Sequence, residues 1–93
     1  MLILRRHKQY IKEYRKVNFS DQHYSRYVSF LSKVIFEEIL PKEAKDHQLQ
    51  GNYKDCREFH ISGDFLVIYR VENNILQLLR IGSHSELFSN KSN

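Results

Sequence analysis

The second half of the chain carries three histidines, an aspartate and an arginine whose side chains could together cleave RNA. They are His47, His60, Asp64, Arg80 and His84. When a ribose 2′-OH attacks the adjacent phosphorus, a base must accept the hydroxyl proton and an acid must protonate the leaving oxygen. A cation must also stabilise the added charge on the phosphorus centre. Imidazole titrates near neutral pH, so a pair of histidines can divide the acid and base roles.

The same histidines and Asp64 are also candidate metal ligands. Neither an HExxH nor a CxxC spacing is present, and the candidate ligands come from separate segments. The formal net charge of +4 favours an anionic phosphate over a bound cation. A Gly-rich phosphate loop, a dinucleotide fingerprint and a serine nucleophile elbow are absent as well. We therefore predict acid–base catalysis with no metal and no cofactor.

The composition is that of one small globular domain. The 93 residues are 41% hydrophobic, which is enough for one core, and we expect a domain over residues 1–88 with a frayed tail at 89–93. Cys56 is the sole cysteine, so a disulfide framework is excluded and a reducing cytoplasm is expected. No apolar run approaches the ~20 residues of a membrane span, and the N-terminus lacks the apolar region of a signal peptide.

Positive charge is concentrated at the N-terminus. Residues 1–20 contain six basic side chains against Glu13 alone, a net charge of +5, and the rest of the chain is close to neutral. Such a footprint favours a polyanionic partner such as RNA, although a solvated basic face explains the charge alone equally well.

The hydrophobic periodicity predicts two helices in the first half of the chain. Residues 2–4 are expected to form a short strand, and residues 7–17 the first helix. Apolar residues from Tyr24 to Ile39 recur at i, i+3 and i+4, which predicts a second helix capped by Ser20 or Asp21 and ended by Pro41. Residues 42–52 are expected to be irregular.

The second half of the chain is predicted to be an antiparallel meander. Three apolar or alternating runs, at 53–61, 65–72 and 75–81, are separated by the turn dipeptides Ser62-Gly63 and Asn73-Asn74. The expected fold is therefore α+β, in the order β-α-α-β-β-β, with the two N-terminal helices packed on one face of an antiparallel sheet.

Two-residue turns would set a definite register. Ile61 would face Asp64, and Val67 would face Arg80. The helices would then cover a face carrying Phe59, Ile61, Leu66, Ile68, Leu79 and Ile81. The opposite face would carry Glu58, His60, Phe65, Val67, Tyr69 and Arg80. We expect Arg80 to pair with Glu58, and residues 62–64 and 82–84 to meet at one end of the sheet. Nothing in the pattern positions His47 over this face.

Four motifs from Lys45 to Phe88 together resemble the YafQ branch of the RelE-like toxins. They are Lys45-Asp46-His47-x-Leu49-x-Gly51, Arg57-Glu58-x-His60-x-x-x-Asp64, Leu66-x-Ile68-Tyr69 and Arg80-x-Gly82-Ser83-His84-Ser85-Glu86-Leu87-Phe88. Residues 1–40 match this family only in their pattern of elements.

The resemblance implies a type II toxin that cleaves mRNA in the ribosomal A site of the 30S subunit. It implies a cognate antitoxin as partner, and binding to operator DNA only in complex with that antitoxin. It suggests acid–base roles for His47, His60, Asp64 and His84, and phosphate stabilisation for Arg80. Contacts to substrate are expected for Phe88, Glu58 and Phe65; Phe65 occupies, loosely, the aromatic position that follows the aspartate in many members.

Two other functional classes remain open at this point. A basic, non-catalytic module that binds nucleic acid or the ribosome would depend on residues 5–16 and tolerate loss of His60 or His84. A repressor subunit that acts only with its antitoxin would bind DNA weakly by itself, with a shallow dependence on salt.

Overall fold

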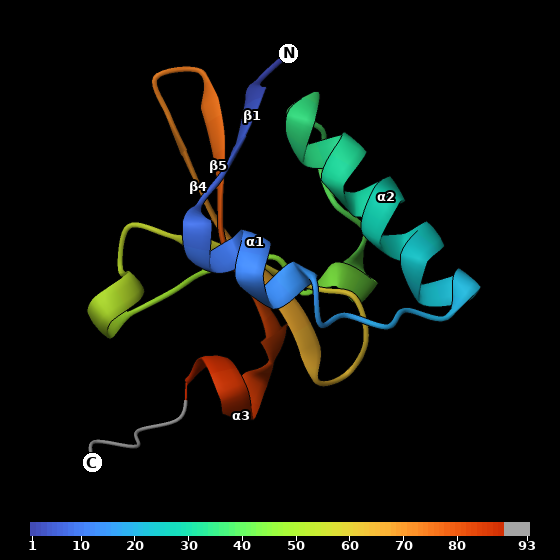
Figure 1. Cartoon of the computed structure of the whole chain (residues 1–93). Helices are drawn as coiled ribbons and strands as arrows, with labels where there is room; N and C mark the ends of the chain where they lie inside the picture. The colour runs from blue at the N-terminus through green and yellow to red at the C-terminus, as the bar shows by residue number, and fades with distance from the viewer. Residues whose placement is uncertain (89–93) are drawn as a thin grey trace.

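The computed structural model describes residues 1–88, so the tail predicted at 89–93 lies outside the described residues. Three helices, of which α3 is a single turn, and a five-stranded sheet make up most of the described chain (Figure 1). In chain order the elements are β1 (Ile3–Arg6), α1 (Lys8–Tyr14), α2 (Asp21–Ile35), β2 (His47–Gln48), β3 (Arg57–His60), β4 (Phe65–Glu72), β5 (Ile75–Ser83) and α3 (His84–Leu87). Short 3₁₀ turns at Lys42–Ala44 and Gly51–Tyr53 flank β2. The α+β class is confirmed.

The strand order is β1-β5-β4-β3-β2, so β4 lies at the centre of the sheet. The predicted β3–β4–β5 meander is antiparallel, whereas β1 pairs with β5 in parallel. The sheet is therefore mixed, and it has one strand more than predicted, because β2 adds to the free edge of β3. Among the described residues, no helix is both long and apolar enough to cross a membrane.

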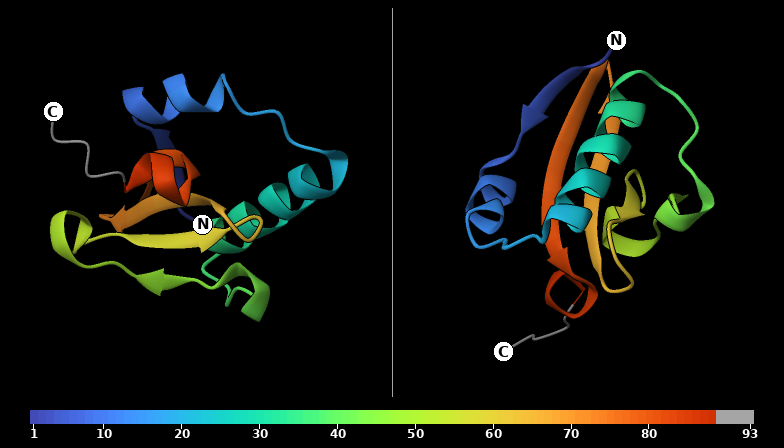
Figure 2. Two further views of the ribbon diagram at one scale, coloured as in Figure 1. Left: turned by 90° about the horizontal axis from the view of Figure 1, so that it is seen from below. Right: turned by 90° about the vertical axis from the view of Figure 1, so that its right-hand side faces the viewer.

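As predicted, both long helices cover the same face of the sheet (Figure 2). Tyr10 of α1 and Phe30 of α2 are buried against Phe59, Val67 and Ile81. A second, smaller cluster lies on the opposite face. It consists of Cys56, Leu66, Ile68 and Leu87, with Leu49, Tyr53, Leu79 and Phe88 packed around it. The sheet thus has an apolar layer on each side.

Helix α2 begins where predicted and ends earlier. The Ser20 side chain accepts a hydrogen bond from the His23 N–H at 3.1 Å and caps the first turn. The helix ends at Ile35, so the predicted end at Pro41 is wrong. Glu37 adopts a left-handed φ of 57°, and the N–H of Glu38 bonds back to the Lys33 carbonyl at 2.8 Å, as in a Schellman motif. Ile39 is consequently 93% exposed.

The predicted register of β4 is wrong by one residue. His60 pairs with Leu66 and Glu58 with Ile68, because the β3–β4 turn closes with Ile61 opposite Phe65. Leu66 and Ile68 therefore face away from the helices, and Phe65, Val67 and Tyr69 face toward them. A slip in β4 puts no polar residue into either layer, because residues 66–69 are all buried apolar or aromatic side chains.

The β4–β5 turn is the predicted two-residue turn. Asn73 and Asn74 both have positive φ, and Glu72 pairs with Ile75. Between this turn and Arg80, however, β5 contains a β-bulge. Tyr69 pairs with Leu78 and Ile68 with Arg80, so Leu79 is the extra residue and lies in the second cluster, not on the helix side as predicted. Glu58, Ile68 and Arg80 are aligned across three strands on the face opposite the helices.

Candidate active site

Glu58 is the buried centre of a carboxylate–histidine group on the face opposite the helices. Its side chain is only 4% exposed. One carboxylate oxygen, Oε2, lies 2.7 Å from Nε2 of His60 and 3.3 Å from Nε2 of His47. The two imidazole rings are 6.3 Å apart. A carboxylate only accepts hydrogen bonds, so Nε2 of His60 carries the hydrogen and Glu58 fixes the orientation of the ring.

His47 reaches this group because residues 45–48 are pinned to the sheet. Strand β2 pairs His47 with Glu58. The neighbouring Asp46 carboxylate accepts two hydrogen bonds from the Arg57 guanidinium, at 3.2 Å each, and a third from the Tyr69 hydroxyl at 2.7 Å. Burial and the hydrogen bond to Asp46 raise the pKa of Tyr69, so it stays a donor. The sequence pattern gave no sign of this short strand.

His47 makes a second contact, which orients its ring. Its Nδ1 donates a hydrogen bond to the Lys45 carbonyl oxygen at 2.6 Å. Its Nε2 faces Oε2 of Glu58 at 3.3 Å. The side chain is 53% exposed, so the ring can be reached from solvent.

Arg80 lies on the same face but does not pair with Glu58, so that prediction is wrong. Its guanidinium donates through Nε and Nη2 to the Glu13 carboxylate, with the shortest contact at 2.6 Å, and through Nη1 to the Tyr53 hydroxyl at 2.8 Å. Glu13 also accepts a hydrogen bond from the backbone N–H of Ile81 at 3.1 Å. That N–H is available because the pairing of β1 with β5 stops at Leu78.

The Glu13–Arg80 pair is held in its charged state. Burial alone would raise the pKa of Glu13, but hydrogen bonds from Arg80, Gln9 and the Ile81 N–H lower it below its usual value. The hydrogen bond to Glu13 raises the pKa of Arg80 in turn. The guanidinium has five N–H donors, and these contacts leave one hydrogen on each Nη for a further acceptor.

The β3–β4 turn and the start of α3 lie at the same end of the sheet (Figure 2), and Asp64 and His84 meet there, as predicted. Asp64 lies in the β3–β4 turn and His84 is the first residue of α3; the His84 N–H donates to the Asp64 carbonyl at 2.8 Å. Helix α3 is set by a capping box. The Ser83 hydroxyl accepts from the Glu86 N–H, and the Glu86 carboxylate accepts from the Ser83 N–H. Both Asp64 and His84 are exposed.

The three residues expected to contact substrate lie in different places. The Phe88 ring lies 4.6 Å from the His84 ring and 5.9 Å from Tyr53, on the face opposite the helices. Glu58 is in the buried centre described above. Phe65 points to the helix side, where its ring meets Phe19 edge-on at 5.6 Å.

The candidate site therefore has two parts on one face, separated by the apolar side chains of β4. Glu58 and Arg80 both align with Ile68, which puts them two strand spacings apart, about 10 Å. Sequence reasoning missed Glu13, Tyr53 and Asp46. The sole signal for Glu13 was that it is the single acidic residue in a basic segment.

Comparisons with known proteins give the family. Residues 2–89 match the sequence model described as a bacterial toxin of type II toxin–antitoxin systems, YafQ. The chain belongs to the YafQ toxin family. The mRNA interferase toxin YafQ of Escherichia coli K12 is 35% identical over 63 residues, which cover 66% of this chain and 68% of that protein. The family resemblance inferred from the four sequence motifs is confirmed.

Solved YafQ-like structures share the fold over nearly the whole chain. A metal-bound toxin from Helicobacter pylori superposes with a TM-score of 0.83 at 34% identity, covering 95% of this chain and all of that one. YafQ in the E. coli DinJ–YafQ complex superposes with a TM-score of 0.81 at 25% identity, covering 96% of this chain and all of that one. Within residues 1–88, no three His, Cys, Asp or Glu side chains form a cluster that could hold a metal ion.

Proposed function

We propose that this YafQ-family toxin is an mRNA endoribonuclease that acts on the ribosome and cleaves by 2′-OH attack without a metal ion. The proposal rests on the side chains that lie together on one face of the sheet. They are the Glu58-centred pair of histidines, Arg80 with its free N–H donors, and the neighbouring Asp64 and His84. These are the base, acid and cation that the reaction needs.

In the proposed mechanism Asp64 is the base. The candidate bases are Asp64 and His60. Nδ1 of His60, the lone pair left when Nε2 donates to Glu58, is buried without a hydrogen-bond partner among the described residues, whereas Asp64 is exposed. The Asp64 carboxylate takes the 2′-OH proton as the 2′ oxygen attacks phosphorus. His60 then has a positioning role, because its hydrogen bond fixes the Glu58 carboxylate and that carboxylate contacts His47.

The acid and the cations complete the reaction. His84, protonated, delivers its proton to the departing 5′ oxygen, and the P–O5′ bond breaks. The remaining Nη hydrogens of Arg80, and the His47 ring, stabilise the negative charge on the phosphorus centre. The products are a 2′,3′-cyclic phosphate, which water can open to a 3′-phosphate, and a 5′-OH. The Phe88 ring, packed on His84, offers a surface for a base of the RNA.

The basic surface supports action on the ribosome, in the cytoplasm where mRNA is translated. All six basic residues of the segment 1–20 are exposed. Glu13, the one acidic residue of this segment, is paired with Arg80, so it neutralises little of the positive charge on the exposed surface. A strongly positive surface of this kind fits ribosomal RNA and speeds association with it. We propose a cognate antitoxin as the silencing partner, in line with the DinJ–YafQ complexes of E. coli. Operator DNA would be bound only by the complex of this toxin with its own antitoxin.

The proposal is tested by His84→Ala in a translation extract, with His23→Ala as the matched control. His23 lies in the first turn of α2, away from the site. Loss of the acid should slow mRNA cleavage about 10²–10⁴-fold, with the circular dichroism spectrum unchanged. The control should cleave at the wild-type rate. If the folded His84→Ala variant cleaves mRNA at the wild-type rate, His84 is not the acid of the reaction.

The competing class, a non-catalytic basic module, makes the opposite prediction. Charge reversal at Lys8, Lys12, Arg15 and Lys16 would abolish its effect on translation, while alanine at His60 and His84 would have none. Mapping the ends of mRNA fragments separates the two classes, since a module that only binds leaves the message intact.

A further inference from the structure

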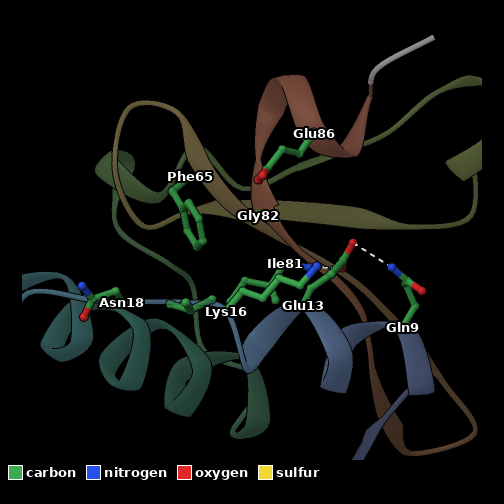
Figure 3. Close-up of a pocket in the computed structure, with 9 residues that line it drawn as sticks. Gln9, Glu13, Lys16, Asn18, Phe65, Ile81, Gly82 and Glu86 are labelled. Atoms are coloured by element: carbon green, nitrogen blue, oxygen red, sulfur yellow. Dashed lines mark hydrogen bonds between the residues drawn. The ribbon is translucent and has the colours of Figure 1, made fainter. Parts of the chain in front are cut away.

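A cavity of about 290 Å³ lies on the helix side of the sheet, around the edge of β5 from Arg80. Gln9 and Glu13 of α1 form one wall, and Lys16, Val17 and Asn18 follow in the α1–α2 connection. Figure 3 shows these side chains facing Phe65 at the start of β4 and Glu86 of α3 across the opening. Ile81 and Gly82 of β5 complete the lining.

We propose that this cavity binds one nucleoside of the RNA strand next to the cleaved phosphate. The inference rests on the proposed function and extends it to a subsite for the flanking nucleotide. The volume lies just below the usual range for small-ligand pockets, about 300–1,000 Å³, which suits a ligand no larger than a single nucleoside.

The position of the cavity connects it to the candidate active site. Phe65 directly follows Asp64, and Gly82 is two residues before His84. The backbone bond from the His84 N–H to Asp64 joins these two segments at the same end of the sheet. An RNA strand whose phosphate lies at Asp64 and His84 therefore passes the mouth of the cavity within one nucleotide.

The lining has the groups that bind a nucleotide. The half-buried Phe65 presents an aromatic ring for a base, and bases of every kind stack on aromatic side chains. The amide of Asn18 can both donate to and accept from a base edge. The ammonium of Lys16 is exposed and makes no ion pair or hydrogen bond among the described residues, so it can meet a phosphate.

The two carboxylates of the lining do not oppose an anionic ligand as strongly as their charges suggest. Glu13 is bound to Arg80 and to the Ile81 N–H. Glu86 accepts the Ser83 N–H of the capping box, and hydrogen bonds with Ser83 lower its pKa. Lys16 makes no ion pair or hydrogen bond within residues 1–88, although its charge also helps to lower the pKa of Glu86.

The four nucleoside 3′-monophosphates are the probes for this site. Each is titrated into the full-length protein while backbone amide chemical shifts are followed. Saturable shifts are expected at Lys16, Asn18, Phe65 and Gly82. Lys16→Ala and Asn18→Ala should each weaken binding roughly 5–10-fold, the size of one lost polar contact. Lys8→Ala, in α1 and outside the cavity, is the control and should bind like the wild type.

Shifts confined to the histidine face, no saturable shift at these amides, or equal affinity in Asn18→Ala and Lys8→Ala would each overturn the inference. Mapped cleavage positions provide a second readout. In Asn18→Ala the distribution of cleavage positions among sequences should change. If the wild type binds nucleotides in the cavity but cuts no message, the proposed function fails and the binding site stands.

Discussion

Replacing Glu13 by glutamine should destabilise the fold far more than removing an ordinary surface ion pair. The Glu13 and Arg80 side chains are 17% and 23% exposed, and Glu13 accepts from both the guanidinium and the Ile81 N–H. Exposed pairs contribute at most about 1 kcal/mol, and breaking a fully buried one costs about 3–5 kcal/mol. The Glu13→Gln variant should lie between these limits, at about 2–3 kcal/mol. For a domain of this size that lowers Tm by roughly 10–20 °C.

The assay is urea unfolding followed by circular dichroism, with Glu38→Gln as the control. Glu38 pairs with Lys33 at 3.8 Å, with side chains that are 59% and 38% exposed, so its loss should cost less than about 1 kcal/mol. Equal unfolding midpoints for the two variants at pH 7 would refute the reasoning.

The effect of Glu13→Gln should also depend on pH with a definite sign. The folded protein lowers the pKa of Glu13, so the carboxylate binds protons less readily when folded than when unfolded. Its contribution is therefore complete above the unfolded pKa, about 4.3, and is lost as the pH falls through the lower folded value. The stability difference between wild type and Glu13→Gln should shrink between pH 5 and pH 3. A difference that stays constant over that range would show that lost packing, and not lost charge, is responsible.

Three further outcomes follow from other contacts. A Cβ added at Gly82 would lie 3.1 Å from Oε1 of Glu86 and 3.2 Å from Cδ2 of Leu87, so Gly82→Ala should displace α3, cost about 1–3 kcal/mol in thermal melts, and slow mRNA cleavage through His84. Tyr69→Phe removes the 2.7 Å hydrogen bond to Asp46 and should cost about 1–2 kcal/mol, whereas Tyr24→Phe, at a residue that is 49% exposed, should cost less in the same melts. Treating the purified protein with a chelator of transition metals should leave cleavage unchanged; activity lost and then restored by adding a metal back would contradict the metal-free mechanism.

The order of the principal elements could be predicted because each one has a strong local signal. Ser20 supplies a helix cap, Asn73-Asn74 supplies a two-residue turn, and the apolar spacing of α2 marks its buried face. The end of α2 could not be predicted, because the left-handed position that terminates the helix is occupied by Glu37, where glycine or asparagine is the usual signal.

The register of β4 could not be predicted from the sequence, for a different reason. A strand that is apolar on both sides has no polar residue to oppose a one-residue slip, so its sequence is compatible with either register. The bulge at Leu79 has no sequence signal of its own.

The partners of the site residues depended on contacts between distant segments. Glu13 meets Arg80 across 67 residues, and Asp46 meets Tyr69 across 23. Hydrophobic periodicity identifies which side chains share a face, which is why Glu58 and Arg80 were correctly placed together on the face opposite the helices. It does not identify ion-pair partners, and the expected Glu58–Arg80 pair was accordingly wrong.

The position of β4 between two apolar layers has a consequence for hydrogen exchange. Amides of residues 66–69 are bonded to strands on both sides and covered on both faces, so they should exchange with solvent only when the whole domain unfolds. The amides of α2, exposed along its outer side at Tyr24 and Val28, should exchange through smaller openings. A molecule in which α2 has transiently opened would then still hold Glu58 and Arg80 on either side of Ile68. Proteolysis that begins at α2 would encounter a toxin whose chemical groups are still assembled.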